Sequence, residues 1–234
     1  MESDPDLLLL ISHPFNLRIE PIDTFKIGFS PCTPWLIPEY SRSRARLRYT
    51  SPMLCDAHIH APELAERDPG FPERFRAGGY RACSAAHSGP ELDAARALRD
   101  SGLDLRLSFG IHPQWTIWTW ADRLAEEARD GRIEAIGEAG FDFFGDRPER
   151  VRNPENLVAQ RSAFEYQLGL AERYGLPLVL HVRRALDLVF EYAPRLKRIP
   201  AALLHSWSGP LAEARSLLAK GVPAYFSFGA PVLN

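Results

Sequence analysis

The chain has 234 residues, of which 45% are hydrophobic and 25% are charged, and its formal net charge at pH 7 is −2. These values are typical of one folded domain with a sizeable core, and they exclude a disordered chain dominated by charge. The near-neutral balance argues against a strong overall field for polyanions, so phosphate contacts would be local, a role that suits the prevailing Arg side chains.

Cysteine usage and the first apolar run bear on location. The three cysteines, Cys32, Cys55 and Cys83, share no tight spacing. A sparse, odd set argues against a disulfide scaffold and favours a reducing compartment. The run 7–11 is too short to span a bilayer, and the acidic residues before it make it a poor signal peptide. We therefore expect a cytoplasmic protein with no membrane association and no obligate protein partner.

Residues 1–52 differ from the rest of the chain. Prolines recur there, and neither a helical nor a strand period is sustained. We interpret this stretch as an irregular N-terminal extension, either a loose arm or a stretch upstream of a true start at Met53. A structured N-terminal addition is the less favoured alternative.

From residue 53 onward, short apolar runs alternate with amphipathic stretches, which predicts parallel strands joined by helices. Helices are expected around 90–100 and 120–129. The longest predicted helix starts near Asn153, a capping residue followed by Pro154, and ends at Gly175. The predicted strands are 54–59, 80–86, 103–109, 133–137, 177–180, 201–204 and 224–228.

Most of the seven histidines lie at the carboxyl ends of predicted strands, which meet at one mouth of a parallel barrel. His58 and His60 are two residues apart, so both point to the same face of a strand. Imidazole and carboxylate groups together suit Zn, Mn, Fe or Ni. Such groups would lack partners in one place unless cations held them. The groups expected to meet are His58, His60, Glu138, His181 and His205.

Three further polar residues are open to two interpretations. Asp56 shares the face of His58 and is either a ligand or an acceptor that orients a histidine. His87 follows the second predicted strand, where an ordinary polar role is favoured. For His112, after the third strand, a functional and an ordinary role are evenly balanced.

Several segments resemble the motifs of TatD-like deoxyribonucleases, a family within the amidohydrolase-type barrels. Residues 55–60 (CDAHIH) resemble the opening D-x-H-x-H, and residues 135–142 (AIGEAGFD) resemble I-G-E-x-G-L-D. Residues 176–185 (LPLVLHVRRA) and 205–209 (HSWSG) resemble the P-x-x-x-H-x-R-x-A and H-x-F-S-G blocks. Gln160, Phe164 and Gln167 are similar to the Q-x-x-x-F-x-x-Q helix. The blocks occur in order between Met53 and Asn234, so the set is highly specific.

The resemblance implies a TIM-type (β/α) barrel that hydrolyses phosphodiesters with two divalent metal ions (Zn, Mn, Mg or Ni). The expected reaction is 3′ exonucleolytic trimming of DNA. By this resemblance His58 and His60 hold one ion, His181 and His205 hold the second, and Glu138 bridges the two as the catalytic centre. Arg183 is expected to clamp a phosphate oxygen, and His112 to contact the substrate.

A tryptophan cluster follows the third predicted strand. Trp115, Trp118 and Trp120 are able to stack on nucleic-acid bases, but packing of the loop and helix is the favoured interpretation.

The chain also departs from the family pattern. The family carries an acidic metal ligand on an eighth strand, and the sequence ends at Asn234 before that strand, so we expect an incomplete barrel over 53–234 with seven of eight strands. Because residues 1–52 lack a helical period, we do not expect them to fill the gap. Gln114 and Arg184 replace a histidine and an aspartate common in the family. The alternatives are a hydrolase of a small amide, lactone or phosphoester, and an inactive truncated remnant.

Overall fold

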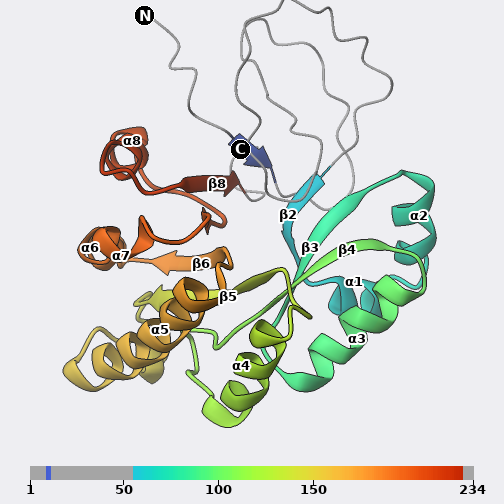
Figure 1. Ribbon diagram of the computed structural model, residues 1–234, viewed down its shortest axis with the longest axis horizontal. Helices are drawn as coiled ribbons and strands as arrows, with labels where there is room; N and C mark the ends of the chain where they lie inside the picture. Colours follow the sequence, from blue (N-terminus) through green and yellow to red (C-terminus); the bar gives the residue numbers. More distant parts are fainter. Residues whose placement is uncertain (1–8, 12–54, 229–234) are drawn as a thin grey trace, which may run out of the picture.

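The computed structural model describes residues 9–11 and 55–228 (Figure 1). Its sheet is parallel throughout, with the strand order β1-β8-β7-β6-β5-β4-β3-β2. Seven of these strands are the predicted ones, so the expected barrel is confirmed. The strands are β1 (Leu9–Ile11), β2 (Cys55–Ile59), β3 (Arg81–Ala86), β4 (Asp104–Phe109), β5 (Ala135–Asp142), β6 (Leu178–Arg183), β7 (Ala202–Leu204) and β8 (Ala224–Phe228).

Helices connect the strands, and α3, α4, α5 and α8 lie around the outside of the sheet (Figure 1). The helices near 90–100 and 120–129 are confirmed, whereas α1 and α2 were not predicted. Among the described residues, no helix is long and apolar enough to cross a bilayer. The helices are α1 (Ala61–Arg67), α2 (Phe71–Ala77), α3 (Gly89–Asp100), α4 (Ala121–Arg129), α5 (Pro154–Tyr174), α6 (Leu186–Glu191), α7 (Ala193–Leu196) and α8 (Leu211–Ala219), with 3-10 turns at Trp118–Trp120 and Pro148–Arg150.

The N-terminal segment contributes one strand to the sheet. In β1, Leu9 pairs with Phe226 and Ile11 pairs with Phe228 of β8, in parallel. The same strand also lies against β2 at the other end of the sheet (Figure 1). The expectation that this segment leaves the gap unfilled is therefore wrong. A strand of three residues pairs through its backbone, and that pairing requires no helical period in the sequence.

Helix α5 begins and ends where the sequence predicts. The Asn153 side chain accepts a hydrogen bond from the backbone N–H of Asn156, at 2.8 Å. Gly175 ends the helix with a φ of 64°, in the left-handed region that glycine occupies without steric cost.

Two glutamines on the buried face of α5 fix the loops that carry the candidate site. The Gln167 amide accepts a hydrogen bond from the Ile111 N–H at 2.8 Å and donates one to the Ile111 carbonyl at 3.0 Å. Gln160 forms the same pair of bonds with the backbone of Asp142. Each amide satisfies a buried backbone donor and a buried backbone acceptor of one residue. The two glutamines of the helix motif are therefore clamps on the ends of β4 and β5.

Strand β5 is buried along its whole length and contains two glycines that permit close contact with β6. A Cβ atom at Gly137 would lie 2.4 Å from the Val179 carbonyl oxygen, and one at Gly140 would lie 2.3 Å from the His181 carbonyl oxygen. Both glycines also have positive φ angles, of 142° and 132°. The I-G-E-x-G pattern thus brings the backbone of β5 against β6 on either side of Glu138.

The Gln167 clamp leads to a prediction about stability. Replacing Gln167 with Leu leaves the buried N–H and carbonyl of Ile111 without partners, at about 1–3 kcal/mol for each group. We expect the free energy of unfolding, measured by urea denaturation, to fall by about 2–6 kcal/mol. Val158→Ala, at an exposed position of the same helix, should change it by less than about 0.5 kcal/mol. Equal stability of the Gln167→Leu variant and the parent would contradict the clamp.

Candidate metal centre

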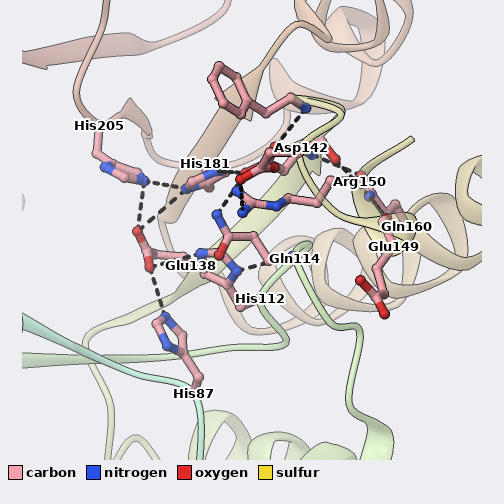
Figure 2. A network of polar contacts seen from close by, with 12 residues as sticks. His87, His112, Gln114, Glu138, Asp142, Glu149, Arg150, Gln160, His181 and His205 are labelled. Atoms are coloured by element: carbon pink, nitrogen blue, oxygen red, sulfur yellow. Dashed lines mark hydrogen bonds and ion pairs between the residues drawn. The ribbon is translucent and has the colours of Figure 1, made fainter. Parts of the chain in front are cut away.

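One buried carboxylate lies at the centre of the strand ends. Glu138 is 2% exposed, and each of its oxygens faces three imidazole nitrogens. Figure 2 shows it with His87, His112, His181 and His205. Oε1 lies 3.0 Å from His58 Nε2, 2.7 Å from His205 Nε2 and 3.9 Å from His181 Nδ1. Oε2 lies 2.8 Å from His87 Nε2, 3.4 Å from His112 Nε2 and 3.9 Å from His60 Nε2.

The six imidazoles form a closed circle around Glu138. Neighbouring rings in this circle have centroids between 4.2 and 5.4 Å apart. His58 and His181 lie in the carboxyl-terminal halves of their strands, and His112 lies three residues past β4. The other three rings belong to the residue just after a strand, and parallel strands bring all these ends to one mouth. In order around the circle the rings are those of His58, His60, His87, His112, His181 and His205.

Asp142, the last residue of β5, orients His181 from outside the circle. Its Oδ2 lies 2.8 Å from His181 Nε2, which leaves Nδ1 pointing toward Glu138 (Figure 2). The Gln114 amide donates a second hydrogen bond to Oδ2 at 2.8 Å, and the Phe144 N–H donates one to Oδ1. Burial raises the pKa of Asp142, but the hydrogen bonds from His181 and Gln114 outweigh it and hold the pKa below its usual value. An ionised carboxylate therefore fixes this ring.

The electrostatics favour a neutral imidazole at His58, His60 and His112, beside an ionised Glu138. Burial lowers the pKa of His58 and His60, and it lowers that of His112 to about 4, despite the opposing effect of Glu138. Burial alone would raise the pKa of Glu138, but hydrogen bonds from the imidazoles, His112 first, hold it well below its usual value. His181 differs, because Asp142 and Glu138 outweigh burial and raise its pKa.

These residues fit divalent cations. A carboxylate offers about four acceptor positions, whereas six ring nitrogens point at Glu138. His181 Nδ1 and His205 Nε2 also lie 3.2 Å from each other. Neutral imidazole nitrogens and carboxylate oxygens are the donors that Zn and similar ions prefer. Within residues 55–228, the groups able to hold an ion are His58, His60 and Glu138; His87, His112 and Glu138; and Glu138, His181 and His205.

All five residues expected to ligate metal therefore lie together, and His112 joins them. His87, for which the sequence favours an ordinary polar role, lies directly against Glu138. Its signal was its place immediately after β3, since His112 likewise follows a strand, three residues past the end of β4. Asp56 belongs to none of these groups, and its carboxylate accepts a hydrogen bond from the backbone N–H of His58 at 3.1 Å.

The expected substrate residues lie nearer the rim. Arg183, the last residue of β6, is exposed, and its guanidinium lies 3.9 Å from the centroid of the Phe144 ring. Trp115 is 44% exposed and stacks on His112 with a centroid distance of 5.0 Å. Trp118 has the same exposure but packs against Tyr166, and Trp120 packs on the core, as the packing interpretation predicts for this loop.

Comparison with known proteins decides the family, because the TatD related DNase family matches residues 55–234. The chain belongs to the TatD related DNase family. It is 28% identical over 181 residues to the uncharacterized metal-dependent hydrolase YjjV of Escherichia coli K12, covering 72% of this chain and 67% of YjjV. It is 30% identical over 171 residues to the 3′-5′ ssDNA/RNA exonuclease TatD of Enterobacter lignolyticus, covering 70% and 63% of the two chains.

A second exonuclease and a solved structure extend the comparison. The TatD exonuclease of Cronobacter turicensis is 37% identical over 118 residues, covering 48% of this chain and 42% of the relative. The crystal structure of E. coli YjjV has the same fold, with a TM-score of 0.60 at 24% identity, covering 74% of this chain and 66% of YjjV. The chain thus spans between 42% and 67% of the length of these relatives.

The Asp142 contact leads to a prediction about metal affinity. Asp142→Asn removes the charged acceptor that turns His181 Nδ1 inward, so the affinity for one divalent ion should fall by about 10–100-fold. Isothermal titration of the metal-free chain with Zn²⁺ measures this change. Asp146→Asn is the matched control, because Asp146 also pairs with Arg150 but contacts no histidine of the circle. Unchanged affinity in Asp142→Asn would contradict the orienting role.

Proposed function

We propose that this chain is a metal-dependent phosphodiesterase that removes nucleotides from the 3′ end of single-stranded DNA. The observation that carries the proposal is the buried Glu138 with imidazole nitrogens on both of its oxygens, which suits a pair of divalent ions. The names of the exonuclease relatives support the phosphodiester as the bond that is cleaved. No contact of the described residues favours a small amide or lactone.

The proposed metal ligands follow the grouping of the side chains. His58 and His60 would hold one ion, His181 and His205 the other, and Glu138 would bridge them. When bound, two such ions activate a water and stabilise the attacking and leaving oxygens of a phosphodiester. Asp142 holds His181 in the required orientation throughout.

Substrate contacts would come from residues beside the circle. Arg183 carries an exposed guanidinium for which the described residues supply no ion pair, so it is available to a phosphate oxygen. When substrate binds, the Nε2–H of His112 would turn from Glu138 to the substrate, because Nδ1 already accepts a hydrogen bond from the Gln114 backbone. The Trp115 ring stacks on His112, which in turn lies against Glu138, and the exposed part of the indole would stack on the terminal base.

A direct assay tests the activity. The chain, freed of metal and resupplied with Mn²⁺, Mg²⁺ or Zn²⁺, should shorten a 5′-labelled single-stranded oligonucleotide from its 3′ end. Glu138→Gln should reduce the rate by about 100-fold or more, because paired ions contribute several kcal/mol to such reactions. Glu191→Gln, an exposed partner of Arg161, should leave the rate unchanged. Absence of nucleotide release by the parent chain with every ion would refute the proposal.

The proposed stacking role of Trp115 is tested by a pair of substrates. With an ordinary 3′-terminal base, Trp115→Ala should raise KM by about 10-fold, because stacking on an aromatic ring is worth about 1–3 kcal/mol for each base. With a 3′-terminal abasic residue, the same variant should behave like the parent. Trp118→Ala, at an equally exposed indole, should affect neither substrate. Equal losses on both substrates would exclude base stacking at Trp115.

A further inference from the structure

Two histidines approach the same oxygen of Glu138 but differ on their far sides. His87 Nε2 lies 2.8 Å and His112 Nε2 lies 3.4 Å from Oε2 (Figure 2). A neutral imidazole carries one proton, so the partner of the far nitrogen decides whether Nε2 offers an N–H or a lone pair. Only a lone pair is able to bind a metal ion.

The far nitrogen of His112 faces a donor. Nδ1 accepts a hydrogen bond from the backbone N–H of Gln114 at 3.1 Å, and a backbone N–H only donates. The proton of neutral His112 is therefore on Nε2, directed at Glu138. This ring enters the centre as a hydrogen-bond donor.

The far nitrogen of His87 faces an acceptor. Its Nδ1 lies 3.8 Å from Glu91 Oε2, which is longer than a hydrogen bond but places a carboxylate on the side where one usually orients a histidine that binds metal. Glu91 also accepts a hydrogen bond from the His87 backbone N–H at 2.7 Å, and its own N–H bonds Ser88 Oγ. These contacts fix the start of α3, and with it the position of the His87 ring.

A carboxylate stands on the outer side of His181 as well, at a hydrogen-bond distance of 2.8 Å, and the proposed function already places His181 on an ion. There Asp142 occupies the outer nitrogen, and the inner nitrogen points at Glu138. His87 therefore matches a histidine of the ligand type, whereas His112 does not. His60 faces the same oxygen of Glu138 as His87, at 3.9 Å, and supplies a second imidazole on that side.

We infer that His87 ligates a divalent cation on the Oε2 side of Glu138, and that His112 beside it is a hydrogen-bond donor that does not ligate. The inference rests on the metal centre of the proposed function and is independent of the substrate. It adds a ligand from the β3–α3 connection to those from β2 and β5.

A Co²⁺ titration of the full metal-free chain tests the inference, with visible absorption and calorimetry as readouts. His87→Gln should weaken binding of one Co²⁺ by at least about 10-fold and alter the visible spectrum, because a ligand matters at least as much as the groups that orient one. His112→Gln is the matched control, since it removes an imidazole from the same oxygen, and it should leave the affinity within about 3-fold. His87→Asp, which again offers a ligand atom, should restore most of the affinity, and thermal melting of each variant reports folding.

The inference is overturned if His87→Gln binds Co²⁺ like the parent chain, or if His112→Gln loses as much affinity as His87→Gln. Hydrolysis is not measured in this titration. A chain that binds ions as expected but cleaves no oligonucleotide would refute the proposed function and leave the assignment of His87 intact. Nuclease activity of the parent chain, together with unchanged Co²⁺ binding in His87→Gln, would support the proposed function and refute the assignment of His87.

Discussion

The site depends on one buried charge. Glu138 has almost no access to solvent, and an ionised carboxylate in that position is tolerated only when its oxygens are fully partnered. The imidazoles that surround it provide these partners, and burial in turn keeps several of them neutral. The charge and the ring of nitrogens therefore require each other. The ring nitrogens around Glu138 outnumber the hydrogen bonds that one carboxylate is able to accept, and this excess is the chemical basis for cation binding.

The fold holds this arrangement in place through its backbone. Parallel strands bring the residues to one mouth, and the glycines of β5 allow Glu138 to approach β6. Gln160 and Gln167 then tie the ends of β4 and β5 to helix α5, so that Asp142 and the loop before His112 have fixed positions. Gln160 thus acts on the orientation of His181 through Asp142, although the two residues are far apart in the sequence.

Sequence alone predicted that the side chains of five residues meet, and they do, because a strand end determines both position and direction. These residues are His58, His60, Glu138, His181 and His205. It did not distinguish His87, because the contact between Nδ1 and Glu91 depends on how α3 starts and not on the spacing of histidines. Strand β1 was missed for a related reason, since three residues that pair by backbone leave no period to detect. The predicted strand ended too early, at residue 137, because Glu138 and two glycines interrupt the apolar pattern of β5 in the sequence.

Under the proposed function, local charge would let a chain of net charge −2 attract a phosphodiester at this one place. Within the circle, Glu138 supplies the carboxylate of every ligand group found among the described residues, and the remaining ligands are imidazoles. A single negative charge cannot neutralise two divalent cations, so the loaded centre would be locally positive in a buried, poorly screened environment. A phosphodiester brings the missing negative charge. Arg183 at the rim adds to the same field, whereas the ion pairs elsewhere on the surface largely cancel one another.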